Sequence, residues 1–167
     1  LSSGIVMRSA SVGNTVTGNT VEGSGYGVEI YNTSHGNTVT GNTIKQGSDG
    51  GILVQTDRNT ITGNSVQDHG DTGINITGSY NLVSSNKIHN SSGATTNSGL
   101  TVSGDSNTLT GNTISDTSCT TTCYAINIST SFADNNYLSS NIFTGDGTNA
   151  ATIQDLGTGT RYAGQSI

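Results

Sequence analysis

The chain has 167 residues, a formal net charge of −6 at pH 7 and 29% hydrophobic residues, while an average globular domain is roughly 45–50% apolar. Thr, Gly, Ser and Asn supply more than half of the chain, which disfavours a helical protein because these residues are poor helix formers. With only 5 Lys and Arg we expect no nucleic-acid partner, and no apolar stretch approaches the roughly 20 residues that a membrane helix needs. The sequence therefore predicts a narrow core and no membrane insertion.

An eight-residue motif repeats along the whole chain. It first reads Asn14-Thr-Val-Thr-Gly-Asn-Thr-Val21, and later copies start 22 to 29 residues apart. The starts are Asn14, Asn37, Asn59, Asn81, Asn107, Asn136 and, in a degenerate copy, Thr160. Apolar residues occupy the third and eighth places, and the Gly-Asn pair between them predicts a sharp turn. Each copy is therefore read as two short strands joined by that turn.

A second short run precedes each copy, with apolar residues two apart, which is the period of a β-strand. The runs are residues 4–7, 27–30, 51–54, 73–76, 99–102, 125–128 and 150–153. Length variation falls after the eighth place of the motif, so residues 91–98 and 115–124 are expected to be loops. Each repeat is therefore three short strands, and such a unit buries an apolar face only by stacking on its neighbours.

The predicted fold is all-β: a right-handed parallel β-helix of about seven coils, in one domain over residues 1–167 that is read as a segment of a larger protein. Three rows of apolar residues are expected to point inward. The first-strand row is Ile5/Met7, Val28/Ile30, Ile52/Val54, Ile74/Ile76, Leu100/Val102 and Ile126/Ile128. The second is Val16, Val39, Ile61, Val83, Leu109 and Leu138, and the third is Val21, Ile44, Val66, Ile88, Ile114 and Phe143.

An asparagine occupies the sixth motif place in six of the seven copies. An amide at a fixed place in a tight turn pairs with the same amide one coil above and below, and also satisfies turn backbone groups. We therefore expect an internal, structural asparagine ladder of Asn19, Asn42, Asn64, Asn86, Asn112 and Asn141.

The repeated Asn-x-Val-x-Gly-Asn-x-Ile motif after a Gly-Ile-x-Val strand resembles the right-handed parallel β-helix repeats of the pectate-lyase-like superfamily. The resemblance covers essentially the whole chain. That superfamily includes polysaccharide lyases, glycoside hydrolases, alginate epimerases, phage tailspikes, periplasmic copper-site accessory proteins and surface adhesins. The fold by itself does not choose among these functions. The Asp-Pro-His signature of alginate epimerases is absent, since the chain contains no proline.

The densest charged and aromatic group expected on the outer surface lies along one side of coils one to four. We interpret it as a candidate carbohydrate-binding face, and its catalytic residues, if any, are unknown. Its members are Arg8, Glu29, Tyr31, His35, Asp57, Arg58 and Tyr80. No cofactor or metal is predicted; calcium bound by carboxylates remains an alternative. Asp68, His69 and Asp71 are read as ordinary turn residues, with a metal site as the weaker alternative.

Two further patterns are open to more than one interpretation. Cys119 and Cys123 favour a local disulfide in an oxidising compartment over free thiols. Outward threonine pairs such as Thr15/Thr17 and Thr38/Thr40 resemble antifreeze surfaces of the insect type, but Leu82 and other residues interrupt the rows. Threonine also favours exposed strands through its β-branching.

The favoured function is an extracellular, cell-surface or virion β-helix that binds or displays toward polysaccharide, as a scaffold or binding segment. Alternatives are a polysaccharide lyase or glycoside hydrolase acting in an external groove, and a structural, self-assembling or ice-binding solenoid. The expected partner is a polysaccharide or cell-surface glycan. Neither end shows a polar cap, so we also expect further coils or self-association through the solenoid ends or sides.

Overall fold

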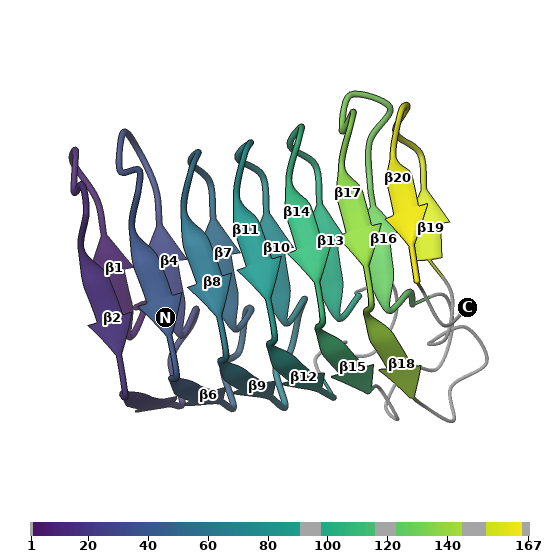
Figure 1. The fold of residues 1–167 in the computed structure, drawn as a ribbon. Helices are drawn as coiled ribbons and strands as arrows, with labels where there is room; N and C mark the ends of the chain where they lie inside the picture. The colour runs from purple at the N-terminus through teal and green to yellow at the C-terminus, as the bar shows by residue number, and fades with distance from the viewer. Residues whose placement is uncertain (1, 91–97, 116–122, 145–152, 165–167) are drawn as a thin grey trace.

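The computed structural model describes residues 2–90, 98–115, 123–144 and 153–164. Within them the chain winds into three parallel sheets, and Figure 1 shows the coils stacked side by side from the N-terminal to the C-terminal end. Sheet 1 contains β1 (Ile5–Met7), β4 (Val28–Ile30), β7 (Ile52–Val54), β10 (Ile74–Ile76), β13 (Leu100–Val102), β16 (Ile126–Ile128) and β19 (Ile153–Asp155). Sheet 2 contains β2 (Thr15–Thr17), β5 (Thr38–Thr40), β8 (Thr60–Thr62), β11 (Leu82–Ser84), β14 (Thr108–Thr110), β17 (Tyr137–Ser139) and β20 (Arg161–Ala163). Sheet 3 contains β3 (Thr20–Glu22), β6 (Thr43–Lys45), β9 (Ser65–Gln67), β12 (Lys87–His89), β15 (Thr113–Ser115) and β18 (Ile142–Thr144).

Three corners join the sheets of a complete coil, and we name them by order along the chain. The first corner joins sheet 1 to sheet 2, the second joins sheet 2 to sheet 3, and the third leads into the next coil. Two sheets have seven strands and the third has six, so six complete coils and part of a seventh are described, close to the predicted seven. No helix long and apolar enough to cross a membrane occurs in the described ranges.

The apolar core runs through the middle of the stack, as predicted. In coils two to six every residue of the three predicted inward rows is 0–1% exposed, apart from the half-buried Phe143. Equivalent residues stand opposite each other on neighbouring strands, for example Ile30 opposite Val54. The core is narrow because each coil contributes only a few aliphatic side chains, and this explains the low hydrophobic content of the chain.

The predicted asparagine ladder is confirmed in the second corner. Asn42 Oδ1 accepts hydrogen bonds from the backbone N–H (2.9 Å) and the Nδ2 (3.0 Å) of Asn19. Asn42 in turn donates from Nδ2 to Asn64 Oδ1 (3.0 Å) and to the carbonyl of Val16 (2.9 Å). The same pattern continues through Asn64, Asn86, Asn112 and Asn141. Each amide thereby satisfies backbone groups that the tight corner would otherwise leave buried and unpaired.

A second asparagine ladder lies in the first corner, and the sequence analysis did not identify it. It consists of the residues that open each motif copy. The backbone N–H of Asn37 donates to Asn59 Oδ1 (3.0 Å), and that of Asn59 donates to Asn81 Oδ1 (2.7 Å). The ladder comprises Asn14, Asn37, Asn59, Asn81, Asn107 and Asn136. Its signal was present in the motif, whose first and sixth places both carry Asn.

The seventh coil departs from the expected register. The repeat predicts Ile153 opposite Ile128, but Ile153 pairs with Ile126, so Asp155 falls opposite Ile128. Tyr162 takes the inward place of sheet 2, opposite Leu138. The phenol of Tyr162 donates to Asp155 Oδ2 at 2.5 Å, and burial together with this carboxylate raises the pKa of Tyr162. The last described coil thus carries a polar pair where earlier coils carry apolar residues.

Candidate functional site

The first corner varies in length from coil to coil, whereas the second does not. In coils three, four and five it is short, over residues 55–58, 77–80 and 103–106, while residues 31–36 and 129–135 make longer corners in coils two and six. In Figure 1 the loop between β16 and β17 extends beyond its neighbours. Variable corners on a regular scaffold are where binding residues concentrate in solenoids.

A surface pocket of about 380 Å³ lies where the long corner of coil two meets the short corner of coil three. All the residues that line it have polar or charged side chains. They are Asn32, Thr33, Ser34, His35, Gln55, Thr56, Asp57 and Arg58. Three of these, His35, Asp57 and Arg58, belong to the predicted carbohydrate-binding face. The other five were missed, although the longer stretch before Asn37 signalled a raised corner there.

Asp57 is held by a row of hydrogen bonds along the first corner. Its Oδ1 accepts the backbone N–H of Ser79 (2.8 Å), and Ser79 Oγ accepts that of Asp105 (3.0 Å). Asp105 Oδ1 accepts the N–H of Asp134 (3.0 Å). Asp134 Oδ1 accepts from the hydroxyl (2.7 Å) and N–H (2.9 Å) of Thr158, and these bonds lower the pKa of Asp134. One oxygen of the Asp57 carboxylate therefore has a structural role and a fixed direction.

Arg58 and Tyr80 stand beside each other on neighbouring coils. The Arg58 guanidinium lies over the Tyr80 ring, with 5.4 Å between the guanidinium carbon and the ring centroid, and Tyr80 is 59% exposed. Both residues have φ of 58°, in the left-handed region that bulky residues rarely adopt. Gly36 holds the equivalent place in coil two with φ of 64°. Such backbone strain in side-chain-bearing residues is a pointer to function, since glycine would meet the geometry more easily.

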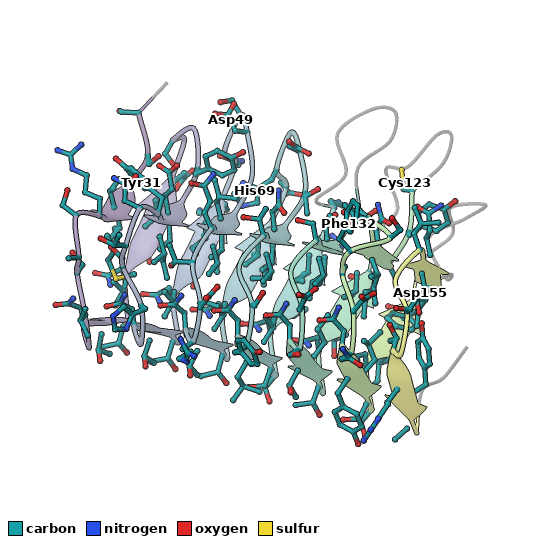
Figure 2. The ribbon with its side chains drawn as sticks, turned by 90° about the horizontal axis from the view of Figure 1, so that it is seen from above. Tyr31, Asp49, His69, Cys123, Phe132 and Asp155 are labelled. Carbon is teal, nitrogen blue, oxygen red and sulfur yellow. The ribbon has the colours of Figure 1, made fainter. Side chains whose placement is uncertain are left out.

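The remaining predicted face residues form a second group on the sheet 1 side of the first corner. Arg8 Nη1 donates to Tyr31 Oη (3.4 Å), and this hydrogen bond raises the pKa of Arg8. Ser3 Oγ donates to Glu29 Oε2 (2.8 Å). None of Arg8, Glu29 and Tyr31 lines the pocket. Figure 2 shows Tyr31 toward the N-terminal end of the stack, away from Phe132 and Asp155.

His69 has a structural role in the third corner. Its side chain is 3% exposed, its Nδ1 accepts the backbone N–H of Gly47 (3.1 Å), and its Nε2 lies 3.2 Å from the carbonyl of Ile44. Burial lowers the pKa of His69. Among the described residues no three His, Cys, Asp or Glu side chains gather to hold a metal ion. Both ring nitrogens of His69 therefore face backbone groups of the preceding coil, while a metal site at Asp68, His69 and Asp71 stays an alternative.

Two further expectations concern the threonine rows and the cysteines. Thr15 and Thr17 align with Thr38 and Thr40 across β2 and β5, and Leu82 interrupts the row in β11 as expected. Cys123 is buried, whereas Cys119 lies outside the described residues, so the disulfide between them stays a prediction.

Comparison with known proteins identifies the fold. Residues 3–166 match the protein family described as right handed beta helix region. A double mutant of the periplasmic alginate epimerase AlgG shares the fold with a TM-score of 0.63 and 14% identity, over 93% of this chain and 48% of that one. The A-module of the mannuronan C-5 epimerase AlgE6 from Azotobacter vinelandii shares it with a TM-score of 0.61 and 17% identity, over 98% of this chain and 55% of that one.

The chain thus spans about half the length of these two solved structures, and at such identities the similarity shows the fold alone. No curated protein shows significant sequence similarity to the chain.

Proposed function

The chain belongs to the right-handed β-helix family, and on this premise we propose that its first corner binds polysaccharide. The observation that carries the proposal is the polar pocket between coils two and three, with the exposed Arg58–Tyr80 pair beside it. Sugars offer hydroxyl groups to polar side chains and an apolar ring face to an aromatic ring. The pocket supplies the first kind of contact, and Tyr80 supplies the second.

The fold neighbours support the choice of ligand class, because both are described as epimerases of alginate or mannuronan, which are polysaccharides. The same proposal places the domain outside the cytoplasm, on a cell or virion surface. The description of one neighbour as periplasmic supports this placement.

The residues of the pocket are better suited to binding a polysaccharide than to hydrolysing it. Glycoside hydrolysis uses two carboxyl groups on either side of the scissile bond. Asp57 is the single acid that lines the pocket, and one of its oxygens is engaged with Ser79. Glu29, the other acid of the predicted face, lies outside the lining.

A second candidate function, β-elimination from a uronate-containing polysaccharide, is favoured by the meeting of His35, Asp57 and Arg58 in one pocket. That reaction needs a base for the C5 proton and a cation beside the uronate carboxylate. An epimerase is disfavoured by the absence of proline, and hence of the Asp-Pro-His signature. Incubation with alginate and polygalacturonate, followed by ultraviolet detection of unsaturated uronates, separates an enzyme from a binding domain.

The binding proposal is tested with Tyr80→Asn, because asparagine tolerates the left-handed backbone of this position. We expect the affinity for the bound polysaccharide, measured by titration calorimetry, to fall about tenfold or more, as for the loss of an aromatic anchor. The matched control is Ser85→Asn, which changes the left-handed residue of the second corner in the same coil. Equal affinities for both variants and the wild type would overturn the proposed site.

A further inference from the structure

All three arginines of the chain stand beside a tyrosine on a neighbouring coil. Arg8 donates to the phenol of Tyr31, and Arg58 lies over the ring of Tyr80. Arg161 pairs in register with Tyr137 on the adjacent strands β20 and β17, and both side chains are exposed. The Arg58–Tyr80 pair belongs to the proposed site, while the other two pairs lie outside the pocket.

Three acids in or next to the first corner accept hydrogen bonds from groups other than the arginines. Glu29 accepts from Ser3, Asp57 accepts from the backbone of Ser79, and Asp155 accepts from Tyr162. Within the described ranges a single salt bridge is formed, between Lys45 and Glu22 on sheet 3. Among the described residues, none of the three guanidinium groups forms a salt bridge with a carboxylate, although Asp57 is adjacent to Arg58 in sequence.

The three pairs follow an oblique line across the first corner. Arg8 and Tyr31 directly follow β1 and β4 of sheet 1. Arg58 and Tyr80 hold the left-handed place just before the ladder asparagine, and Tyr137 and Arg161 are the first residues of β17 and β20 in sheet 2. The line thus moves from sheet 1 to sheet 2 as the coils advance. At about 4.8 Å between neighbouring strands, it extends roughly 29 Å from coil one to coil seven.

We propose that these pairs form one track for an extended acidic polysaccharide, with sugar rings on the tyrosines and sugar carboxylates or sulfates on the arginines. This inference rests on the proposed function and adds the charge and the path of the ligand. The planar guanidinium donates two parallel hydrogen bonds to a carboxylate or sulfate, and tyrosine offers a rigid apolar face. A neutral glycan would contact the tyrosine rings but would offer no negative charge to the guanidinium groups.

The test compares each charged polymer with its uncharged counterpart on the full chain. Polygalacturonate is titrated beside carboxyl-reduced polygalacturonate, and heparin beside desulfated, carboxyl-reduced heparin, so that carboxylates and sulfates are separated. We expect the affinity for at least one charged polymer to exceed that for its counterpart by tenfold or more, and to fall as salt rises.

Arg8→Gln, Arg58→Gln and Arg161→Gln should each lower the affinity for the charged polymer about tenfold. The matched control is Lys87→Gln, which removes one positive charge from β12 of sheet 3 and should leave the affinity unchanged. Urea unfolding of each variant checks that the fold is retained.

The outcomes separate this inference from the proposed function. Equal binding of charged and reduced polymers overturns the acidic ligand but leaves polysaccharide binding intact. Loss of affinity in Arg58→Gln alone overturns the track and confines the ligand to the pocket. Absence of binding to every polymer overturns both proposals.

Discussion

The first and second corners share one backbone design but present different side chains. In both, a left-handed residue precedes a ladder asparagine and donates its N–H to a carbonyl of the next coil, as Arg58 does to Ser79 (3.1 Å) and Gly63 does to Ser84 (3.0 Å). The second corner uses glycine at this place in five of its seven coils, at Gly18, Gly41, Gly63, Gly111 and Gly164. The first corner uses glycine in three coils, and elsewhere Arg58, Tyr80, Ser106 and Asn135.

This difference indicates which corner is scaffold and which is display surface. Holding Arg58 and Tyr80 in the left-handed region opposes folding by on the order of 1 kcal/mol each, and the asparagine ladder beneath them holds the backbone in place. Where no side chain is needed, as in most of the second corner, glycine avoids that strain. Of the four predictions below, given from the largest expected effect to the smallest, two test this distinction and two extend the comparison to the third corner and to sheet 3.

The two ladders should contribute equally to stability. Asn64→Ala removes the acceptor for the N–H and Nδ2 of Asn42 and the donor to the carbonyl of Val39. Several buried groups are left unpaired, so we expect the free energy of unfolding in urea to fall by about 4 kcal/mol. Asn59→Ala in the first corner should have a similar effect, whereas the exposed Asn19 should contribute only about 1 kcal/mol. A small effect at Asn59 beside a large one at Asn64 would show that the corners are not equivalent.

The third corner should make stability pH-dependent through His69. Burial lowers its folded-state pKa below the unfolded value near 6.5, so the unfolded chain binds a proton first as the pH falls. The stabilisation is complete above about pH 6.5 and is lost as the pH falls from there through the folded-state pKa.

The measurement is urea unfolding at a series of pH values. His69→Ala should lower the free energy of unfolding at pH 8 by about 3 kcal/mol, because the Gly47 N–H and Ile44 carbonyl lose their partner, and should remove this pH dependence. His35→Gln, on the exposed first corner, retains His69 and should keep the wild-type pH profile. An unchanged profile in His69→Ala would contradict the assignment.

Substitutions at the left-handed place of the two corners should change stability in opposite directions: alanine for glycine in the second corner should destabilise, and glycine for serine in the first should stabilise. Gly63→Ala has room for the added Cβ, whose nearest neighbour is Gly41 N at 4.0 Å, so backbone strain dominates and we expect a loss of about 1 kcal/mol. Ser106→Gly in the first corner relieves the same strain and should stabilise by about 0.5 kcal/mol, after the greater freedom of glycine in the unfolded chain is subtracted. Thermal unfolding measures both, and like signs would refute the strain argument.

The surface ion pair on sheet 3 should matter least. Lys45 and Glu22 are 3.0 Å apart, but their side chains remain 36% and 50% exposed, so solvent screens the attraction. Glu22→Gln is expected to lower the free energy of unfolding by about 0.5 kcal/mol or less, and the effect should vanish at high salt. A loss above 1 kcal/mol would show that this exposed pair stabilises the fold more than ordinary surface pairs do.

Much of this architecture was predictable because a repeat constrains itself. Every copy must place its aliphatic residues at the same inward positions, so a period of two in the strands and a spacing of 22 to 29 residues determined the sheets, the core rows and the ladder that begins at Asn19. The ladder that begins at Asn14 was equally predictable, because the first place of the motif also carries asparagine. The register of the seventh coil was not, because the run 150–153 has Ile153 as its single large aliphatic residue, and in the structure that residue pairs with Ile126 rather than Ile128.

The site depended on tertiary structure for a different reason. The sequence alone identified His35, Asp57 and Arg58 as outward-facing, because they fall between two inward strands. It could not show that the corners of coils two and three enclose a pocket, or that Asp57 turns toward Ser79 while Arg58 turns toward Tyr80. Those directions are set by the left-handed backbone and by hydrogen bonds to the next coil, which exist only once the coils are stacked.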